Sequence, residues 1–241
     1  MLTKSEIKLI TSLNQKKFRT QQGLFIVEGI KGIQEFLNSR FKLYKLFTTE
    51  ALFNCENTLI SESELKKISL LKTPNTALAV FEIYEPNPIN ESQLIVALDD
   101  IRDPGNLGTI IRLCDWFGIH DLVCSHSTVD CYNPKVVQAT MGSLTRVNIT
   151  YLELEAFLKR SKLQKFGTFM DSKNVYEEQL PENGILILGN EANGISSSIE
   201  KLIDQRLTIP RFGNLKEIES LNVATATAIL LSEFKRRSIG K

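Results

Sequence analysis

From Gln93 onward the chain alternates short apolar runs with amphipathic segments, and this rhythm constrains the fold more than any other feature. Strands are expected at 94–99, 121–124, 166–170, 185–189 and 206–209, and helices at 106–117, 133–141, 153–162, 196–203 and 221–237. Short apolar strands separated by helices are typical of an α/β fold with a parallel sheet covered on both faces. In such sheets ligands bind beyond the carboxyl ends of the strands.

The first part of the chain has its own pattern and predicts a separate small α/β domain. Helices are expected at 4–15, through Ile33–Leu37 and at 62–71, and strands at 24–27, 43–47 and 77–83. A stretch with two prolines and no apolar period follows, at 84–92. We therefore expect a first domain at 1–85, a linker at 86–92 and a second domain at 93–241.

Composition narrows the class of protein. No stretch approaches the ~20 apolar residues of a membrane span, and the start lacks the apolar core of a signal peptide. The four cysteines form no CxxC pair, and there are only two histidines, so no zinc-finger spacing can be written. We expect reduced cysteines, a cytoplasmic location, no membrane partner and no bound metal.

The balanced net charge of +1 conceals a difference between the two parts of the chain. Residues 1–90 carry 12 lysines and arginines against 9 acidic residues, whereas residues 91–241 carry 17 against 19. The basic residues gather early, at Lys16, Lys17 and Arg19 among others. This pattern permits binding to RNA, and a solvated helix face explains it equally well.

Three short motifs follow predicted strands. The first is the run Asn106–Arg112, the second Leu188–Gly194, and the third is Ile209-Pro210 followed by Glu219–Val223. Each motif has a common structural explanation, such as a helix cap or a solvent-facing loop. Because all three lie at carboxyl ends of expected parallel strands, their side chains should converge at one site.

Together, in this order, the motifs resemble those of the SpoU/TrmH family of RNA 2′-O-ribose methyltransferases, in the SPOUT superfamily. The resemblance covers roughly residues 93–238. It implies a trefoil-knotted parallel sheet flanked by helices, a small N-terminal α/β substrate-binding domain, and a homodimer. It also implies S-adenosylmethionine as the methyl donor, with no metal.

The family's site residues can be placed on this sequence position by position. The catalytic set implied is Arg112, Asn106, Glu191, Ser220 and Asn222. The cofactor-binding set implied is Leu188, Gly189, Asn190, Gly194, Ile209, Pro210 and Leu221. Arg112 corresponds to the arginine to which the family assigns proton removal. Since arginine stays protonated as a rule, it is either an activated base or a cation that binds phosphate and the developing alkoxide.

The chain departs from the family pattern in two places. The loop between Pro210 and Ser220 is about three residues longer than usual, and Ala224 stands where a small hydroxyl residue is frequent. The apolar helix expected over Leu221–Leu231 belongs either to the core of the subunit or to a subunit interface. These departures leave the geometry of the third motif open.

Residues 14–37 are similar to the substrate-binding extension of ribosomal-RNA members of the family. This similarity implies RNA contact by Lys16, Lys17 and Arg19. An unrelated α/β domain with exposed lysines is the alternative. The sequence thus predicts methyl transfer to a ribose 2′-OH of structured RNA, ribosomal RNA rather than transfer RNA. A non-catalytic RNA-binding or assembly protein with the same fold is the alternative, and a dinucleotide-dependent oxidoreductase lacks its GxGxxG motif.

Overall fold

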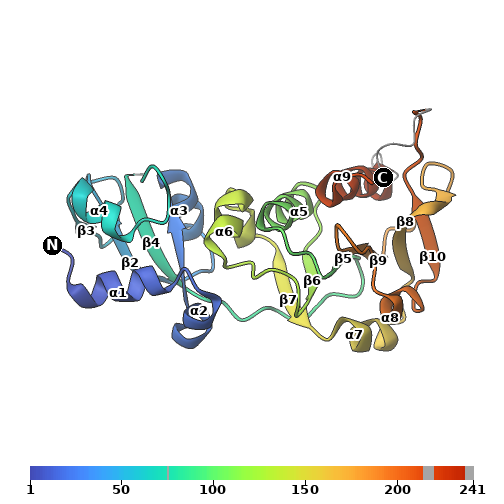
Figure 1. Ribbon diagram of the computed structural model, residues 1–241, viewed down its shortest axis with the longest axis horizontal. Helices are drawn as coiled ribbons and strands as arrows, with labels where there is room; N and C mark the ends of the chain where they lie inside the picture. Colours follow the sequence, from blue (N-terminus) through green and yellow to red (C-terminus); the bar gives the residue numbers. More distant parts are fainter. Residues whose placement is uncertain (75, 214–219, 237–241) are drawn as a thin grey trace. The chain divides into compact units, whose positions relative to one another are not determined.

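The computed structural model describes residues 1–74, 76–213 and 220–236, and the chain divides into two compact units (Figure 1). The first unit comprises residues 1–85 and 130–145, and the second comprises residues 86–129 and 146–241. The segment 130–145 therefore packs with the N-terminal residues, although the sequence pattern assigns it to the second domain.

The first unit contains a small mixed sheet with helices. Its elements are α1 (Lys4–Ser12), α2 (Lys16–Gln22), β1 (Leu24–Glu28), α3 (Ile30–Leu37), β2 (Leu43–Thr48), β3 (Thr58–Leu59), α4 (Glu62–Ile68), β4 (Ala77–Glu82), α6 (Pro134–Thr140) and the 3₁₀ turn η1 (Ser143–Thr145). The strand order is β1-β4-β2-β3, with β4 antiparallel to both of its neighbours. Capping boxes at Thr3 and Ser61 start α1 and α4, as their sequences favour.

Helix α6 packs against β1 and closes an aromatic cluster within the first unit. The ring of Phe25 lies 5.5 Å from that of Phe36 and 4.7 Å from that of Tyr132, just before α6. Edge and tilted contacts of this kind add to the stabilisation that area burial gives. The aromatic cluster explains why the segment 130–145 belongs to this unit.

Arg19 joins the same two parts of the first unit by polar contacts. Its side chain is buried, and its Nε donates a hydrogen bond to Asp130 Oδ2 at 2.9 Å. Its Nη1 donates to the carbonyl oxygens of Leu13 and Asn14 at 2.8 and 2.9 Å. A buried guanidinium is tolerable because its charge is paired and its donors are used.

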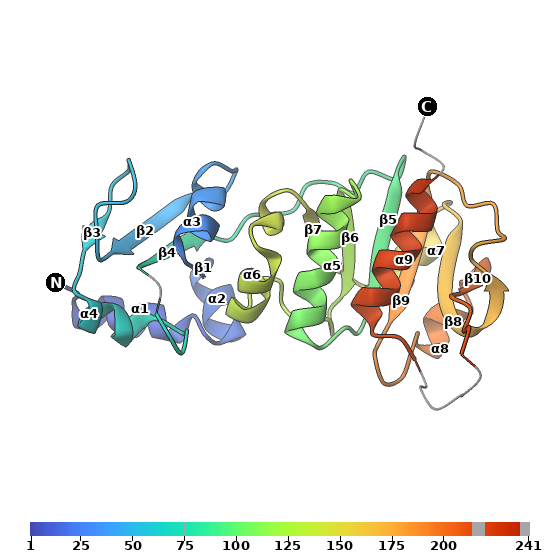
Figure 2. The ribbon, with the colours of Figure 1, turned by 90° about the horizontal axis from the view of Figure 1, so that it is seen from above.

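The second unit holds a six-stranded sheet in which every pairing is parallel, with the order β10-β8-β9-β5-β6-β7. Helices α5 and α9 lie side by side on one face of it, and α7 and α8 lie on the other (Figures 1 and 2). The elements are β5 (Leu94–Asp99), α5 (Pro104–Trp116), β6 (Asp121–Ser125), β7 (Asn148–Leu152), α7 (Leu154–Arg160), β8 (Lys165–Asn174), β9 (Gly184–Gly189), α8 (Ser197–Glu200), β10 (Gln205–Thr208) and α9 (Val223–Arg236). The predicted parallel sheet covered on both faces is confirmed.

The stretch predicted to be a linker is fixed to the sheet of the second unit. The backbone N–H of Asn87 donates to Asn148 Oδ1 at 2.8 Å, and Asn148 Nδ2 donates to Asp121 Oδ1 at 2.7 Å. The N–H of Asn90 donates to the other carboxylate oxygen of Asp121 at 3.2 Å. These bonds satisfy a buried aspartate and asparagine, so residues 87–90 are held as part of the second unit.

The described part of the chain contains no helix that is both long and apolar enough to cross a membrane.

Candidate active site

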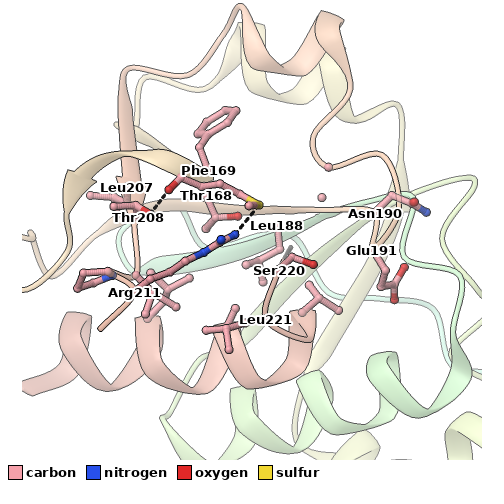
Figure 3. Close-up of a pocket in the computed structure, with 18 of the residues that line it drawn as sticks. Thr168, Phe169, Leu188, Asn190, Glu191, Leu207, Thr208, Arg211, Ser220 and Leu221 are labelled. Carbon is pink, nitrogen blue, oxygen red and sulfur yellow. Dashed lines mark hydrogen bonds between the residues drawn. The ribbon is translucent and has the colours of Figure 1, made fainter. Parts of the chain in front are cut away.

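A cavity of about 570 Å³ opens in the second unit, where the loops after β9 and β10 meet β8 and the start of α9 (Figure 3). All of the predicted cofactor-binding residues line it, namely Leu188, Gly189, Asn190, Gly194, Ile209, Pro210 and Leu221. Glu191 and Ser220 of the predicted catalytic set also line it. The second and third motifs thus converge on one cavity, as the strand positions predict.

Gly189 ends β9 at a point where the chain folds back on itself. The backbone N–H of Asn190 donates to the Gly194 carbonyl at 2.9 Å, and Gly194 N–H donates to the Asn190 carbonyl at 2.8 Å. A Cβ atom on Gly189 would lie 2.2 Å from the carbonyl carbon of Gly194, and Gly194 itself has φ +68°. Both glycines are therefore required by the backbone path, as the sequence indicates.

Asn190 ties the second motif to the end of β5. Its Nδ2 donates to the carbonyl oxygen of Asp100 at 2.7 Å, and its Oδ1 accepts the N–H of Ala192 at 2.9 Å. Asp100 adopts φ +61°, which is rare for a residue with a side chain. Asp99, which is buried, accepts the N–H of Ser196 at 2.7 Å. Sequence reasoning did not identify either aspartate as an anchor of this loop.

A directed chain of hydrogen bonds connects all three motifs. Asn222 Oδ1 accepts N–H groups at the start of α9, from Ala224 at 3.0 Å and Thr225 at 3.2 Å. Asn222 Nδ2 therefore points outward, and it donates to Asn106 Oδ1 at 2.9 Å. Asn106 Nδ2 in turn donates to Glu191 Oε1 at 2.8 Å. Each donor direction is fixed by the one before it, so Glu191 is held as a hydrogen-bond acceptor.

Arg112 lies further along α5, where its side chain is exposed and is not among the residues that line the cavity. The helix begins at Pro104, earlier than predicted, because Asp103 Oδ1 accepts the N–H of Asn106 at 2.8 Å. Asp103, not Asn106, is thus the cap, which leaves the Asn106 side chain available for Glu191.

Sequence reasoning missed one wall of the cavity. Thr168, Phe169 and Met170 of β8 line it, and Arg211 extends into it from the side opposite Glu191 (Figure 3). Arg211 Nη2 lies 3.8 Å from Met170 Sδ, and Thr208 Oγ1 donates to the Met170 carbonyl at 2.9 Å. The strand predicted at 166–170 ends at these residues, so its carboxyl end was an available signal.

The predicted RNA-binding residues of the first unit divide into two kinds. Lys16 and Lys17 are exposed on α2. Arg19 is buried, and its hydrogen bonds to Asp130, Leu13 and Asn14 occupy its guanidinium. A guanidinium in that position does not contact RNA, so the prediction for Arg19 does not fit this structure.

Other reactive groups lie apart from the site chemistry. Cys114 of α5 is buried, and burial raises the pKa of its thiol, so it stays protonated and is a poor nucleophile. Within the described ranges no group of three or more histidine, cysteine, aspartate or glutamate side chains could hold a metal ion.

The third motif contains a loop that is longer than usual for the family. Residues 214–219 of this loop, including Glu219, lie outside the described residues. Ala224 is buried at the start of α9.

Two protein-family models match the chain. Residues 93–232 match the SpoU rRNA Methylase family, and residues 4–79 match the MRM3-like substrate binding domain. The first match contains all three motifs and the whole of the cavity lining. The second covers most of the N-terminal part of the first unit.

Individual proteins match along nearly the full length. A TrmH-family structure from Porphyromonas gingivalis is 40% identical, with a TM-score of 0.88 over 98% of this chain and 99% of that one. An rRNA methyltransferase from Sinorhizobium meliloti, solved with bound S-adenosylmethionine, is 29% identical, with a TM-score of 0.87 over 100% and 97%. The 23S rRNA (guanosine(2553)-2′-O)-methyltransferase of Bacillus subtilis is 28% identical over 94% of each chain.

Proposed function

This chain belongs to the SpoU rRNA methylase family, and we propose that it transfers a methyl group from S-adenosylmethionine to a ribose 2′-OH of ribosomal RNA. The observation that carries the proposal is the convergence of the second and third motifs at one cavity, to which the first motif is joined by the hydrogen bonds from Asn222 through Asn106 to Glu191. A non-catalytic protein has no need of such a directed arrangement beside a cavity of this size.

Ribosomal RNA is favoured as the substrate by the relatives that span the whole chain. The Bacillus subtilis relative is named for methylating a guanosine of 23S rRNA, and it aligns over both parts of this chain. The Sinorhizobium meliloti structure is also named an rRNA methyltransferase. The substrate-binding model at residues 4–79 agrees with a reader of RNA in the first unit.

The cavity fits the proposed cofactor. Its lining combines aliphatic side chains, such as Leu188 and Leu221, with glycines whose backbone groups a ligand can approach. Pockets of ~300–1,000 Å³ with apolar walls and few polar groups are typical of cofactor sites. When bound, S-adenosylmethionine supplies a methyl group on a cationic sulfur, which needs no metal for transfer to oxygen.

The residues of the chain would orient the ribose and assist the loss of its 2′-OH proton. The 2′-oxygen gains the methyl carbon, the carbon–sulfur bond breaks, and the 2′-OH proton leaves. Arg112 either accepts that proton or, as a cation, binds phosphate and stabilises the developing alkoxide while the proton passes to solvent water. Glu191 is a positioning residue in this proposal, because Asn106 fixes its carboxylate at one edge of the cavity.

We further infer a homodimer, a trefoil knot and a cytoplasmic location, as the family resemblance implies. The second copy has a suitable surface on α5, where the side chain of Trp116 is 83% exposed. Apolar residues of α9 such as Leu230 and Phe234 are buried within the subunit, so α9 contributes to the core in any case. Residues 1–85, together with residues 130–145 of the same unit, are proposed to read RNA, and the second unit is proposed to transfer the methyl group.

Calorimetry with S-adenosylmethionine and a methyl-transfer assay on ribosomal RNA from cells lacking the gene test the proposal together. The expected result is cofactor binding, transfer to a single nucleotide, and loss of that 2′-O-methyl mark in the cells. RNA binding without any transfer would instead support the alternative of a non-catalytic assembly protein.

A further inference from the structure

The first unit contains a second cavity that no motif predicted. Its volume is about 520 Å³, within the range of ligand sites, and all of its lining lies in this one unit. It lies among the end of β1, the start of α3, the residues Leu70, Leu71 and Thr76, and α6. None of the residues of the candidate active site contributes to it.

The walls of this cavity are largely apolar. Ile26, Phe36 and Val137 are buried and present aliphatic or aromatic surface to it. Met141 also lines it, with a side chain that is 62% exposed and a backbone φ of +51°. A long side chain in that conformation is unusual, since helix ends of this kind favour glycine. Its flexible thioether is suited to cover a planar apolar ligand.

The lining carries two lysines that suit an anion, and its one acidic residue, Glu28, accepts hydrogen bonds from Ser69 and Leu70. Gly29 precedes α3 with φ +92° and has no side chain to cap the helix. The first N–H groups of a helix have no partner within it, and Ile30 and Lys31, the first two residues of α3, line the cavity. Lys31 and Lys135 line the cavity from two separate helices, and both are exposed. Apolar walls with cations at the mouth match a base joined to a phosphate.

We propose that this cavity binds one unstacked nucleotide of the RNA substrate, with the base between the apolar walls and its phosphate at Lys31 and Lys135. The inference rests on the proposed function, which makes RNA the substrate. Proteins read single-stranded RNA by taking splayed bases onto apolar or aromatic surfaces. Lys16 and Lys17 are exposed in the same unit.

The test uses the full-length chain and two independent changes. Lys31→Glu with Lys135→Glu reverses the charge at the mouth, and Gln138→Trp adds bulk from an exposed lining residue. The matched controls are Lys66→Glu with Lys67→Glu on α4, and Gln34→Trp on α3, all exposed and outside the lining. Thermal unfolding of each variant checks that the fold is kept.

The probe is deproteinised ribosomal RNA from cells lacking the gene, labelled with 4-thiouridine for cross-linking. Both cavity variants should raise the KM for this RNA about tenfold or more, as loss of one stacked base implies. The affinity for S-adenosylmethionine should stay within about twofold, and both controls should match the unchanged chain. Cross-links should map to residues 26–36 and 134–142.

Two results would overturn the assignment. If the unchanged chain methylates the RNA while both cavity variants keep its KM, the cavity does not read RNA although the proposed function stands. If a mixture of free nucleoside monophosphates binds the cavity and ribosomal RNA does not displace it, the ligand is a free nucleotide. Conversely, cross-linking at the cavity without any methyl transfer would support the cavity assignment and contradict the proposed function.

Discussion

Arg112 is exposed on α5 and belongs to the same motif as Asn106. Loss of its side chain should therefore reduce methyl transfer without affecting folding. For Arg112→Ala we expect methyl transfer to fall by about 100-fold or more, the scale of a lost transition-state contact. The unfolding free energy should change by less than ~1 kcal/mol, as at surface sites. Single-turnover kinetics and thermal unfolding measure both. Arg160→Ala, at the exposed end of α7, is the control, and normal turnover by Arg112→Ala would remove this residue from the mechanism.

Arg19 should behave in the opposite way, because its contacts are internal. Arg19→Met leaves the partly buried carboxylate of Asp130 without its cation, and the ~3–5 kcal/mol typical of a fully buried pair is the upper bound of the expected loss of stability. Lys17→Met, on the exposed face of the same helix, should change stability by no more than ~0.5 kcal/mol. Urea unfolding followed by far-ultraviolet circular dichroism compares them. Equal stability of the two variants would mean that the pair does not hold the first unit together.

Glu28 predicts a dependence of stability on pH. Burial raises the pKa of its carboxyl, against the hydrogen bonds that it accepts from Ser69 and Leu70. The folded state therefore holds this proton more tightly than the unfolded chain. The resulting stability is fully present below the ordinary pKa of glutamate and is lost as pH rises through the raised pKa. Glu28→Gln cannot titrate, so its stability relative to the unchanged chain should improve as pH rises above the ordinary pKa of glutamate.

Glu64 supplies a control of opposite sign for that experiment. Hydrogen bonds from the backbone N–H groups of Ser61 and Leu2 lower the pKa of its carboxyl. Its contribution is present above the ordinary pKa of glutamate and is lost as pH falls through the lowered one. Glu64→Gln should therefore become relatively less stable as pH rises. Identical pH profiles for the two variants, measured by urea unfolding, would contradict both assignments.

Among the elements, the loop between β9 and α8 depends most on backbone geometry. Gly189→Ala places a methyl group 2.2 Å from the backbone of Gly194, so the loop must move and the cavity change shape. We expect the affinity for S-adenosylmethionine to fall by about tenfold or more, since cavity lining is displaced. Gly213→Ala is the matched control, because a Cβ atom there meets nothing within 4 Å although the residue lines the same cavity. Titration calorimetry distinguishes them, and equal affinities would mean that the loop tolerates the shift.

Elements with a clear hydrophobic period could be predicted from the sequence, and those defined by tertiary contacts could not. The buried strands β5 and β9 have continuous apolar runs, so their positions were predicted closely. Strand β7 was missed because Asn148–Leu152 is only partly buried at the edge of the sheet and has a mixed composition. Helix α2 was missed because its sequence, Lys16–Gln22, is almost wholly polar.

The site shows the same division. Residues next to strand ends, such as Gly189 and Ile209, line one cavity because parallel strands bring their carboxyl ends together. The sequence does not predict the hydrogen bonds from Asn222 to Asn106 and from Asn106 to Glu191. They depend on Asp103 acting as the N-cap of α5, which leaves the Asn106 side chain to bind Glu191. The membership of the chain in the SpoU family, predicted from its motifs, is confirmed by the family model.

For the whole molecule, RNA affinity and cofactor affinity should be separable. Lys16→Glu with Lys17→Glu reverses two exposed charges of the first unit, and it should weaken binding to ribosomal RNA and flatten its dependence on salt. Affinity for S-adenosylmethionine should not change, because every residue of that cavity lies in the second unit. Filter binding at several salt concentrations measures the slope. The control is Lys162→Glu with Lys201→Glu, two exposed lysines of the second unit. If this control loses as much RNA affinity, the effect comes from total charge and not from a binding surface on the first unit.

The chain passes between its two units three times, after Glu85, Val129 and Thr145. Residues 130–145 fall within the span of the methylase family model, yet Asp130 and Tyr132 hold Arg19 and Phe25 of the N-terminal segment. A recombination event in the stretch 86–92 would therefore separate these partners from each other. Exchange of the N-terminal module between lineages is disfavoured, and new RNA targets should arise in such proteins by paired substitutions on both sides of that boundary.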